Sequence, residues 1–349
     1  MSIEAADPLV RAALWGGLAA FGLTGLVLLQ IVLLRLVLVL AVRREQVFLS
    51  KWRPLLLTCL SAHVPVPLPP LAAGDRVLFL RLWVQLLESV RGASPGLELA
   101  AKQLGCVDMA LEWLEQGNPA RQMLATVALG HLRDQRAWPA LLSGVDHDDA
   151  SRSFASLRAL VQIDGARAAP LMLPLMLTRA QWPIAKFAAL MAAHRDHFGA
   201  LLAQACGAAQ GAPLQRALRL AESLRLPLPS APFADWLGPE QDPAVVVAAL
   251  RNCNMPLLLA LVRPLLAHAD WRVRVQAAKV LGRIGEVGDE QRLIGLLSDV
   301  HWWVRYRAAQ ALHGLPFFDH LHFAVLAGNA SDRFARDMLA QVMAEGKRT

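Results

Sequence analysis

The sequence predicts an all-α protein in which a single N-terminal transmembrane helix is followed by an α-solenoid of helix pairs. Three observations carry this prediction. The chain has 349 residues and is 55% hydrophobic, which is high for a soluble protein, and the excess is concentrated near the N-terminus. Two helix-like segments near the C-terminus repeat each other at a spacing of 31 residues. Weaker copies of the same pattern recur upstream, as expected for a repeat architecture.

The first predicted element is a membrane anchor in residues 1–45. The segment from Ala12 to Leu34 is apolar and uncharged, and after Arg35 the apolar sequence continues to Val42. About 20 such residues span a bilayer core as a helix. A cleaved signal peptide is the competing interpretation, but this apolar stretch is longer than a signal peptide requires. We expect an uncleaved helix, in which Arg35 either snorkels to the interface or faces a membrane partner.

Flanking charges predict the orientation of the anchor. Glu4, Asp7 and Arg11 precede it. After it come one acid, Glu45, and four membrane-proximal basic residues, namely Arg43, Arg44, Lys51 and Arg53. The positive-inside rule then places the N-terminus outside and the C-terminal domain in the cytoplasm, in a bacterial-type inner (plasma) membrane. The basic residues also suit contact with the anionic headgroups of the lipid bilayer.

Residues 46–74 are the predicted connection between the anchor and the solenoid. The segment Gln46–His63 is amphipathic and is expected to lie on the membrane surface or against a partner. The sequence "VPVPLPP", residues 64–70, predicts a stiff extended spacer. The predicted solenoid then occupies residues 75–349.

The strongest internal repeat lies between Asp270 and Leu312. The pairs that align are Val273 with Val304, Arg274 with Arg305, Ala277 with Ala308, Ala278 with Ala309 and Leu281 with Leu312. Weaker copies begin at Asn118, Asp149 and Asp242. One helix pair cannot bury its apolar face alone, but a stack of pairs can.

Local features of the repeat fit helices. Asp270 and Asp299 stand at predicted N-cap positions, and Gly282 and Gly285 mark the predicted end of the first helix. The apolar positions recur at helical spacing: Val273, Ala277, Leu281 and Ile284. A second helix is expected to turn three leucines inward, Leu293, Leu296 and Leu297.

This pattern resembles the HEAT repeat, in the short form also known from phycobilisome-lyase-like proteins. The resemblance is strong for Asp270–Leu312, moderate for Asn118–Asp164 and weak for Gln181–Gln241. It implies extended surfaces that bind proteins. It also implies a structural ladder, formed by Asp270, Arg274, Asp299 and Arg305, in which each arginine pairs with an aspartate of an adjacent repeat.

Three tryptophans flank the predicted helix starts, and one of them is expected to pack between repeats. Because Trp302 and Trp303 point about 100° apart on a helix, at most one of the two fills that gap. The other, with Arg307, is expected near the surface, where aromatic and arginine side chains often anchor interfaces. The third tryptophan is Trp271. The candidate partner contacts are therefore Trp302, Trp303, Arg307 and Arg35.

No pattern in the sequence predicts a catalytic, cofactor-binding or metal-binding residue. The four cysteines are far apart and form no CxxC pair, which fits free thiols in a reducing cytosol. "DHDD", residues 146–149, and "DHLH", residues 319–322, lack further ligands at suitable spacing. Phosphate-binding loops and nucleophile motifs are likewise missing from the sequence.

The resulting hypothesis is a non-catalytic scaffold or regulatory subunit that binds a protein partner at the cytoplasmic face of the membrane. The partner is expected to be an integral membrane protein, and a glycosyltransferase or polysaccharide synthase is one candidate by analogy with accessory subunits. Two alternatives remain open. One is a bilin lyase-like enzyme, which absorbance changes on mixing with a bilin would reveal. The other is a HEAT-like nucleic-acid-binding protein, which the anchor and the modest net charge of +7 disfavour.

Overall fold

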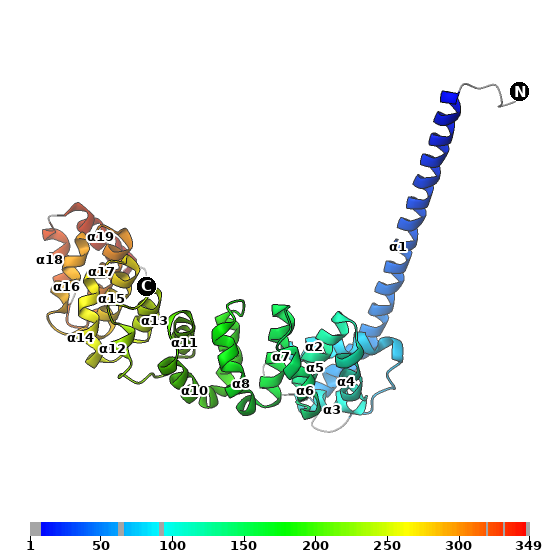
Figure 1. Ribbon diagram of the computed structural model, residues 1–349, viewed down its shortest axis with the longest axis horizontal. Coiled ribbons are helices and arrows are strands. Elements are labelled where there is room, and N and C mark those ends of the chain that lie inside the picture. Colours follow the sequence, from blue (N-terminus) through cyan, green and yellow to red (C-terminus); the bar gives the residue numbers. More distant parts are fainter. Residues whose placement is uncertain (1–7, 62–65, 91–93, 319, 331, 347–349) are drawn as a thin grey trace, which may run out of the picture. The chain divides into compact units, whose positions relative to one another are not determined.

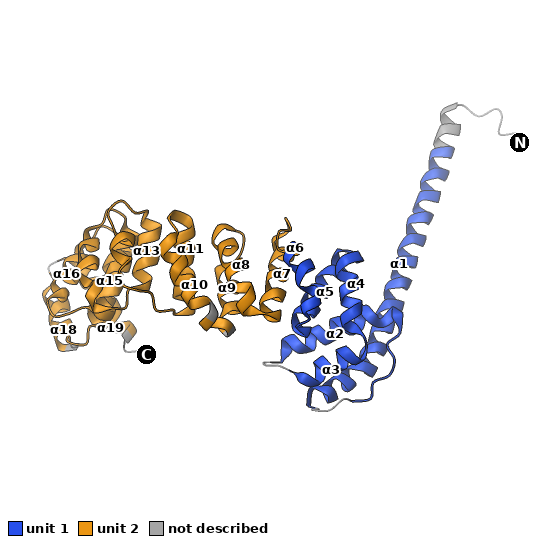
Figure 2. Ribbon diagram, turned by 60° about the horizontal axis from the view of Figure 1, so that its bottom comes forward, with its two compact units in different colours: residues 1–143 blue, residues 144–349 orange. Residues whose placement is uncertain are grey.

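A computed structural model describes residues 8–61, 66–90, 94–318, 320–330 and 332–346. These residues form helices without any strand, which confirms the predicted all-α solenoid (Figure 1). The chain divides into two compact units, residues 1–143 and residues 144–349 (Figure 2). Glu4 and Asp7, which contribute to the predicted orientation, lie outside the described residues, as does Asp319 of the "DHLH" motif.

The first unit begins with the longest helix and continues with short helices that pack against its end. Its elements are α1 (Pro8–Ser61), η2 (Ala73–Asp75), α2 (Arg76–Ser89), α3 (Pro95–Gln103), α4 (Cys106–Gln116), α5 (Pro119–Leu132), η3 (Gln135–Ala137) and most of α6 (Trp138–Gly144).

The second unit is a succession of antiparallel helix pairs (Figure 2). Its elements are α7 (Ala150–Ile163), α8 (Gly165–Thr178), α9 (Ile184–Met191), η4 (Ala192–His194), α10 (Arg195–Ala208), α11 (Gly211–Leu224), α12 (Phe233–Trp236), α13 (Pro243–Asn252), η5 (Pro256–Leu258), α14 (Leu259–Val262), η6 (Arg263–Ala267), α15 (Trp271–Ile284), α16 (Asp289–Gly295), η7 (Leu296–Ser298), α17 (Trp302–Gly314), α18 (His320–Asn329) and α19 (Arg333–Gly346).

Helix α1 serves two different environments. Every described side chain from Leu14 to Val42 is exposed, although nearly all are apolar. One face of the following turns is buried, and its residues are Phe48, Trp52, Leu56 and Cys59. Trp52 meets Phe79 of α2 edge-on, with 5.0 Å between ring centroids. Among the described residues, α1 alone is long and apolar enough to cross a membrane, a criterion that an anchor and a signal sequence both meet.

Helix α1 runs without a break across the predicted boundary at residue 45 and continues to Ser61, so Gln46 does not start a separate helix. The apolar face that suggested surface attachment is used inside the first unit instead. The spacer of residues 64–70 lies partly outside the described residues, and residues 66–70 have no regular structure.

Repeat helices in both units begin at side-chain caps. Asn118, Asp149, Asp242 and Asp270 each accept a hydrogen bond from a backbone N–H two or three residues further on. Such a bond satisfies an amide that has no partner within the helix. The aspartates and the asparagine that open each copy of the pattern therefore set where α5, α7, α13 and α15 start.

Asp299 is not the N-cap of α17, contrary to the prediction. The N-cap is His301, which is the residue that aligns with Asp270 at a spacing of 31. Asp299 instead aligns with His268. The side chain of Asp299 accepts a hydrogen bond from the N–H of His301 at 2.8 Å, and the side chain of His268 accepts one from the N–H of Asp270 at 3.0 Å.

The predicted apolar positions of the repeat are buried. Val273, Ala277 and Leu281 of α15 and their aligned partners in α17 have no exposed surface, whereas Ile284 at the end of α15 is only half-buried. Leu293, Leu296 and Leu297 of the following helix also face the core. The Pro-rich segment of residues 225–243 lies within the second unit. The division at residue 143 has no counterpart among the domains predicted from the sequence.

Gly282 lies inside α15 rather than at its end, because the helix continues to Ile284 and is capped by Gly285. A Cβ atom on Gly282 would come within 2.7 Å of the Cα and 2.8 Å of the Cβ of Ala311 in α17. These distances are too short for carbon atoms. The absence of a side chain at Gly282 therefore allows the two repeat helices to approach each other.

We predict that Gly282→Ala destabilises the protein by about 1–3 kcal/mol, because α15 and α17 must move apart. Gly295→Ala is the matched control: a Cβ atom there meets nothing within 4 Å, and alanine favours helix by up to about 1 kcal/mol. Chemical unfolding of the detergent-solubilised chain, followed by tryptophan fluorescence, measures both changes. Equal stability of the two variants would contradict the close approach.

Candidate protein-binding surface

The arginine ladder has one complete rung, between Arg274 of α15 and Asp299. Nε of Arg274 donates to Oδ2 of Asp299 at 2.7 Å, and Nη2 donates to Oδ1 at 2.9 Å. The side chains are only 11% and 9% exposed. Nη1 of Arg274 also donates to the carbonyl oxygens of His268 and Ala269. This bidentate pair holds the start of one repeat against the start of the next.

The predicted rung at Arg305 is wrong, because no described carboxylate pairs with it. Its Nη1 donates to the carbonyl oxygens of Asp299 and Val300, which match those that Arg274 uses. The residue that follows Asp299 by 31 positions is Ala330, which has no carboxylate. Nε of Arg305 is buried without a hydrogen-bond partner among the described residues, and the guanidinium lies 5.0 Å from the ring of Phe334.

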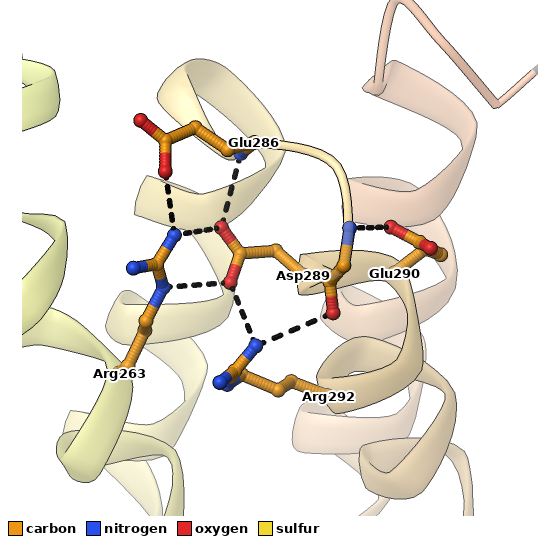
Figure 3. A network of polar contacts seen from close by, with 6 residues as sticks. Arg263, Glu286, Asp289, Glu290 and Arg292 are labelled. Carbon is orange, nitrogen blue, oxygen red and sulfur yellow. Dashed lines mark hydrogen bonds and ion pairs between the residues drawn. The ribbon is translucent and has the colours of Figure 1, made fainter.

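A second buried carboxylate, which the sequence analysis missed, links neighbouring helix pairs (Figure 3). Asp289 of α16 is fully buried and receives two bonds from Arg263 of η6, at 2.8 Å and 3.0 Å. The backbone N–H of Glu286 and the guanidinium of Arg292 complete its shell. Arg263 and Asp289 stand outside the aligned repeat positions, so the self-similarity of the sequence gave no signal for them.

Both buried carboxylates are held in the charged form. Burial by itself would raise the pKa of Asp289 and Asp299, but hydrogen bonds from Arg263, Arg274 and backbone N–H groups lower each pKa below the usual aspartate value. A lowered folded-state pKa means that the unfolded chain takes up protons first in acid. The pairs therefore stabilise the fold fully above the unfolded-state pKa of about 4 and lose this contribution as the pH falls through the lower folded-state values.

The aromatic side chains at the start of α17 form a surface cluster of Trp302, Trp303 and Tyr306. Trp302 is 39% exposed and Trp303 is 50% exposed, so neither fills the gap between repeats as was predicted for one of them. Val304 and Ala308 occupy that space instead. Trp302 stacks on Tyr306 with 5.0 Å between centroids, and Trp303 meets Trp302 edge-on at 4.7 Å.

Trp271 is the tryptophan that reaches across to the next repeat. Its ring stacks on His301, the N-cap of α17, with 5.7 Å between centroids. Tyr306 was not among the predicted contacts, although its spacing of four residues from Trp302 places both rings on one helix face. That spacing was the signal in the sequence.

Polar contacts fix the aromatic cluster in place. The hydroxyl of Tyr306 donates to Oε2 of Glu345 in α19 at 2.8 Å and accepts a bond from Nε2 of Gln310 at 2.7 Å. The guanidinium of Arg307 lies 5.4 Å from the Tyr306 ring and donates to Oε1 of Gln310. The structure thus brings Trp302, Trp303 and Arg307 together on one surface, as a rigid aromatic patch with a cation beside it.

Residues 235–313 match the family model for HEAT repeats. The match runs from α12 to α17 and includes both arginine–aspartate pairs. HEAT repeats commonly mediate protein–protein interaction, and the matched segment is a helical repeat scaffold. No curated protein matches the chain.

The remaining predicted contacts lie on α1. Arg35 is exposed in the middle of the apolar stretch and has no partner among the described residues. Arg43, Arg44, Lys51 and Arg53 are exposed at the end of that stretch, and Arg44 forms an ion pair of 2.7 Å with Asp75. A cavity of about 510 Å³ opens here, and its lining includes Arg43, Arg44, Lys51 and Asp75.

We predict that Arg274→Ala costs about 3–5 kcal/mol of unfolding free energy, because Asp299 would stay buried without its partner. Arg305→Ala should lower the free energy of unfolding less, by about 1–2 kcal/mol, since it removes only the donor to the carbonyl oxygens of Asp299 and Val300 and the cation beside the Phe334 ring. Denaturant unfolding of the two variants measures the difference. A loss at Arg305 as large as that at Arg274 would show that Arg305 has a carboxylate partner after all.

Proposed function

We propose that the chain is a membrane-anchored HEAT-repeat scaffold, without catalytic activity of its own, that holds a protein partner at the cytoplasmic face of the membrane. The observation that carries this proposal is the two-part character of α1. Its exposed apolar stretch needs lipid around it, while the same helix continues into the core of the first unit. An apolar segment that is part of a folded core fits an uncleaved anchor better than a removable signal sequence.

The partner contact in this proposal is the aromatic patch of Trp302, Trp303 and Tyr306 with the adjacent Arg307. Large aromatic side chains and arginine contribute most to the affinity of protein interfaces. The patch is already ordered by Gln310, so little conformational entropy is lost on binding.

A membrane protein is the proposed class of partner. Arg35 is a charge within the apolar stretch, and such charges in membrane helices usually pair with another protein group or reach toward water. A glycosyltransferase or polysaccharide synthase remains our candidate, by analogy with accessory subunits of such enzymes. The short, lyase-like form of the repeat stays a prediction from the sequence.

The membrane-proximal basic residues support the proposed contact with anionic lipid. The cavity beside Arg43, Arg44 and Lys51 lies where the fully exposed apolar stretch of α1 gives way to its buried face. A bilayer around residues 14–42 would place these cations at headgroup level.

We predict that a reporter active only in the cytoplasm is active when fused after Thr349. The reason is the group of cations from Arg43 to Arg53, which the positive-inside rule keeps in the cytoplasm. Paired fusions of cytoplasm-only and periplasm-only reporters in a bacterial host measure the orientation. Activity of the periplasm-only reporter at this position would overturn it.

We predict that the double change Trp302→Ala and Trp303→Ala leaves the melting temperature within a few degrees of the parent protein, because both rings are largely exposed. Partner capture from solubilised membranes should weaken by about 2 kcal/mol or more, roughly 30-fold in affinity. Leu257→Ala is the control, since it removes a 66% exposed apolar side chain from η5 of the same unit. Unchanged capture by the folded double variant, or equal loss in the control, would remove the patch from the proposal.

A further inference from the structure

Four basic side chains of the second unit converge on one cavity. The cavity has a volume of about 400 Å³ and is lined by Arg251 of α13, Lys279 and Arg283 of α15, and Arg307 of α17. Glu222 of α11 is the one carboxylate in the described lining. Three helices that are separate in sequence thus supply cations to a single space, and one acid cannot neutralise them.

Three of the four cations have partial anchors within the protein. Arg251 lies 3.5 Å from Glu222, Nη2 of Arg283 donates to the carbonyl of Cys253, and Arg307 donates to Gln310. These bonds orient the guanidinium groups but leave most of their N–H donors free, since each guanidinium has five.

Lys279 has no hydrogen-bond or ion-pair partner among the described residues, although it faces this cavity. Partial burial and the nearby charges of Arg307, Arg251 and Arg283 lower the pKa of its amine, and Glu222 opposes this only in part. The three guanidinium groups thus oppose the charge on Lys279, and an anion placed in the cavity would offset their repulsion.

Gln276 adds a neutral donor to the lining. Its side chain is only 7% exposed and lines the cavity, yet its amide makes no hydrogen bond with any described residue. The amide is not among the buried polar atoms that lack a partner, so it reaches the solvent of the cavity. Beside four cations, it can donate a hydrogen bond to a ligand with acceptor oxygens.

We propose that this cavity is a binding site for a phosphate ester that carries two or more negative charges, such as a diphosphate group. A single carboxylate would leave most of the positive charge uncompensated, whereas a diphosphate balances the excess of three cations over Glu222. Guanidinium groups match phosphate oxygens in bidentate geometry. The volume lies in the lower part of the range of small-molecule sites, which fits a compact polyanion better than an extended peptide or nucleic acid.

The site goes beyond the proposed scaffold function and can be tested without knowing the protein partner. Inorganic pyrophosphate is the probe, titrated calorimetrically at low salt into the detergent-solubilised full chain. We expect saturable binding of one pyrophosphate per chain. Lys279→Ala should weaken it at least tenfold, and Gln276→Leu should weaken it several-fold.

Arg272→Ala is the matched control. It removes the same charge from the same helix, but Arg272 is paired with Asp270 and lies outside the cavity lining. The affinity of the Arg272→Ala variant for pyrophosphate should stay within twofold of that of the parent protein. Melting temperatures show whether each variant is folded. If Gln276→Leu does not fold, Lys279→Ala alone decides the outcome, since Lys279 is exposed and has no partner among the described residues.

Competition distinguishes the two sources of the phosphate group. Displacement of pyrophosphate by a short-chain soluble phosphatidic acid would assign the site to a lipid headgroup, and retention would assign it to a soluble phosphate ester. Three results would overturn the proposal: no saturable binding by the folded parent chain, equal weakening by Arg272→Ala, or Lys279-dependent binding of duplex DNA or polyglutamate without binding of pyrophosphate.

Discussion

The first unit depends on one helix that must satisfy two environments. The N-terminal part of α1 is exposed and apolar on all sides, so it is stable only where lipid or another protein covers it. The C-terminal part buries Phe48, Trp52 and Leu56 within the first unit, so it is stable only as part of a folded core. A continuous helix couples these two requirements, because the apolar stretch cannot turn freely relative to the core that the same helix enters.

The second unit is stabilised by a different device, which combines close helix approach with paired charges. Gly282 lets α15 and α17 pack closely, and the buried carboxylates of Asp289 and Asp299 are each held by an arginine from the preceding helix pair. Removing one member of such a pair destabilises the fold by more than the intact pair stabilises it, because the other charge stays buried. These pairs therefore favour one register between neighbouring repeats. The aromatic patch and the basic cavity, which we propose as binding surfaces, both lie on this frame.

The sequence predicted what depends on periodic local pattern and missed what depends on distance in space. The cap at Asp270 follows from an aspartate directly before a helical pattern, and the buried stripe from Val273 to Leu281 follows from helical spacing; the structure confirms both. The predicted N-cap of α17, Asp299, lies two residues before the observed N-cap, His301. The lack of a carboxylate partner for Arg305 and the convergence of cations from α13, α15 and α17 were not predicted. Both depend on how separate repeats pack in space, which the sequence pattern of one repeat does not show.

The central claim is that one continuous helix joins the proposed anchor to the core of the first unit. Hydrogen–deuterium exchange of the full chain in lipid nanodiscs, followed by mass spectrometry, measures this most directly along residues 36–61. The account predicts slow exchange at the amides of this segment, with no gap between Arg43 and Phe48, because the N–H groups of a continuous helix are hydrogen-bonded; Pro54 has no N–H to exchange. A segment of rapid exchange at those residues, with slow exchange on both sides, would show a flexible joint and would contradict a rigid coupling of the apolar stretch of α1 to the first unit.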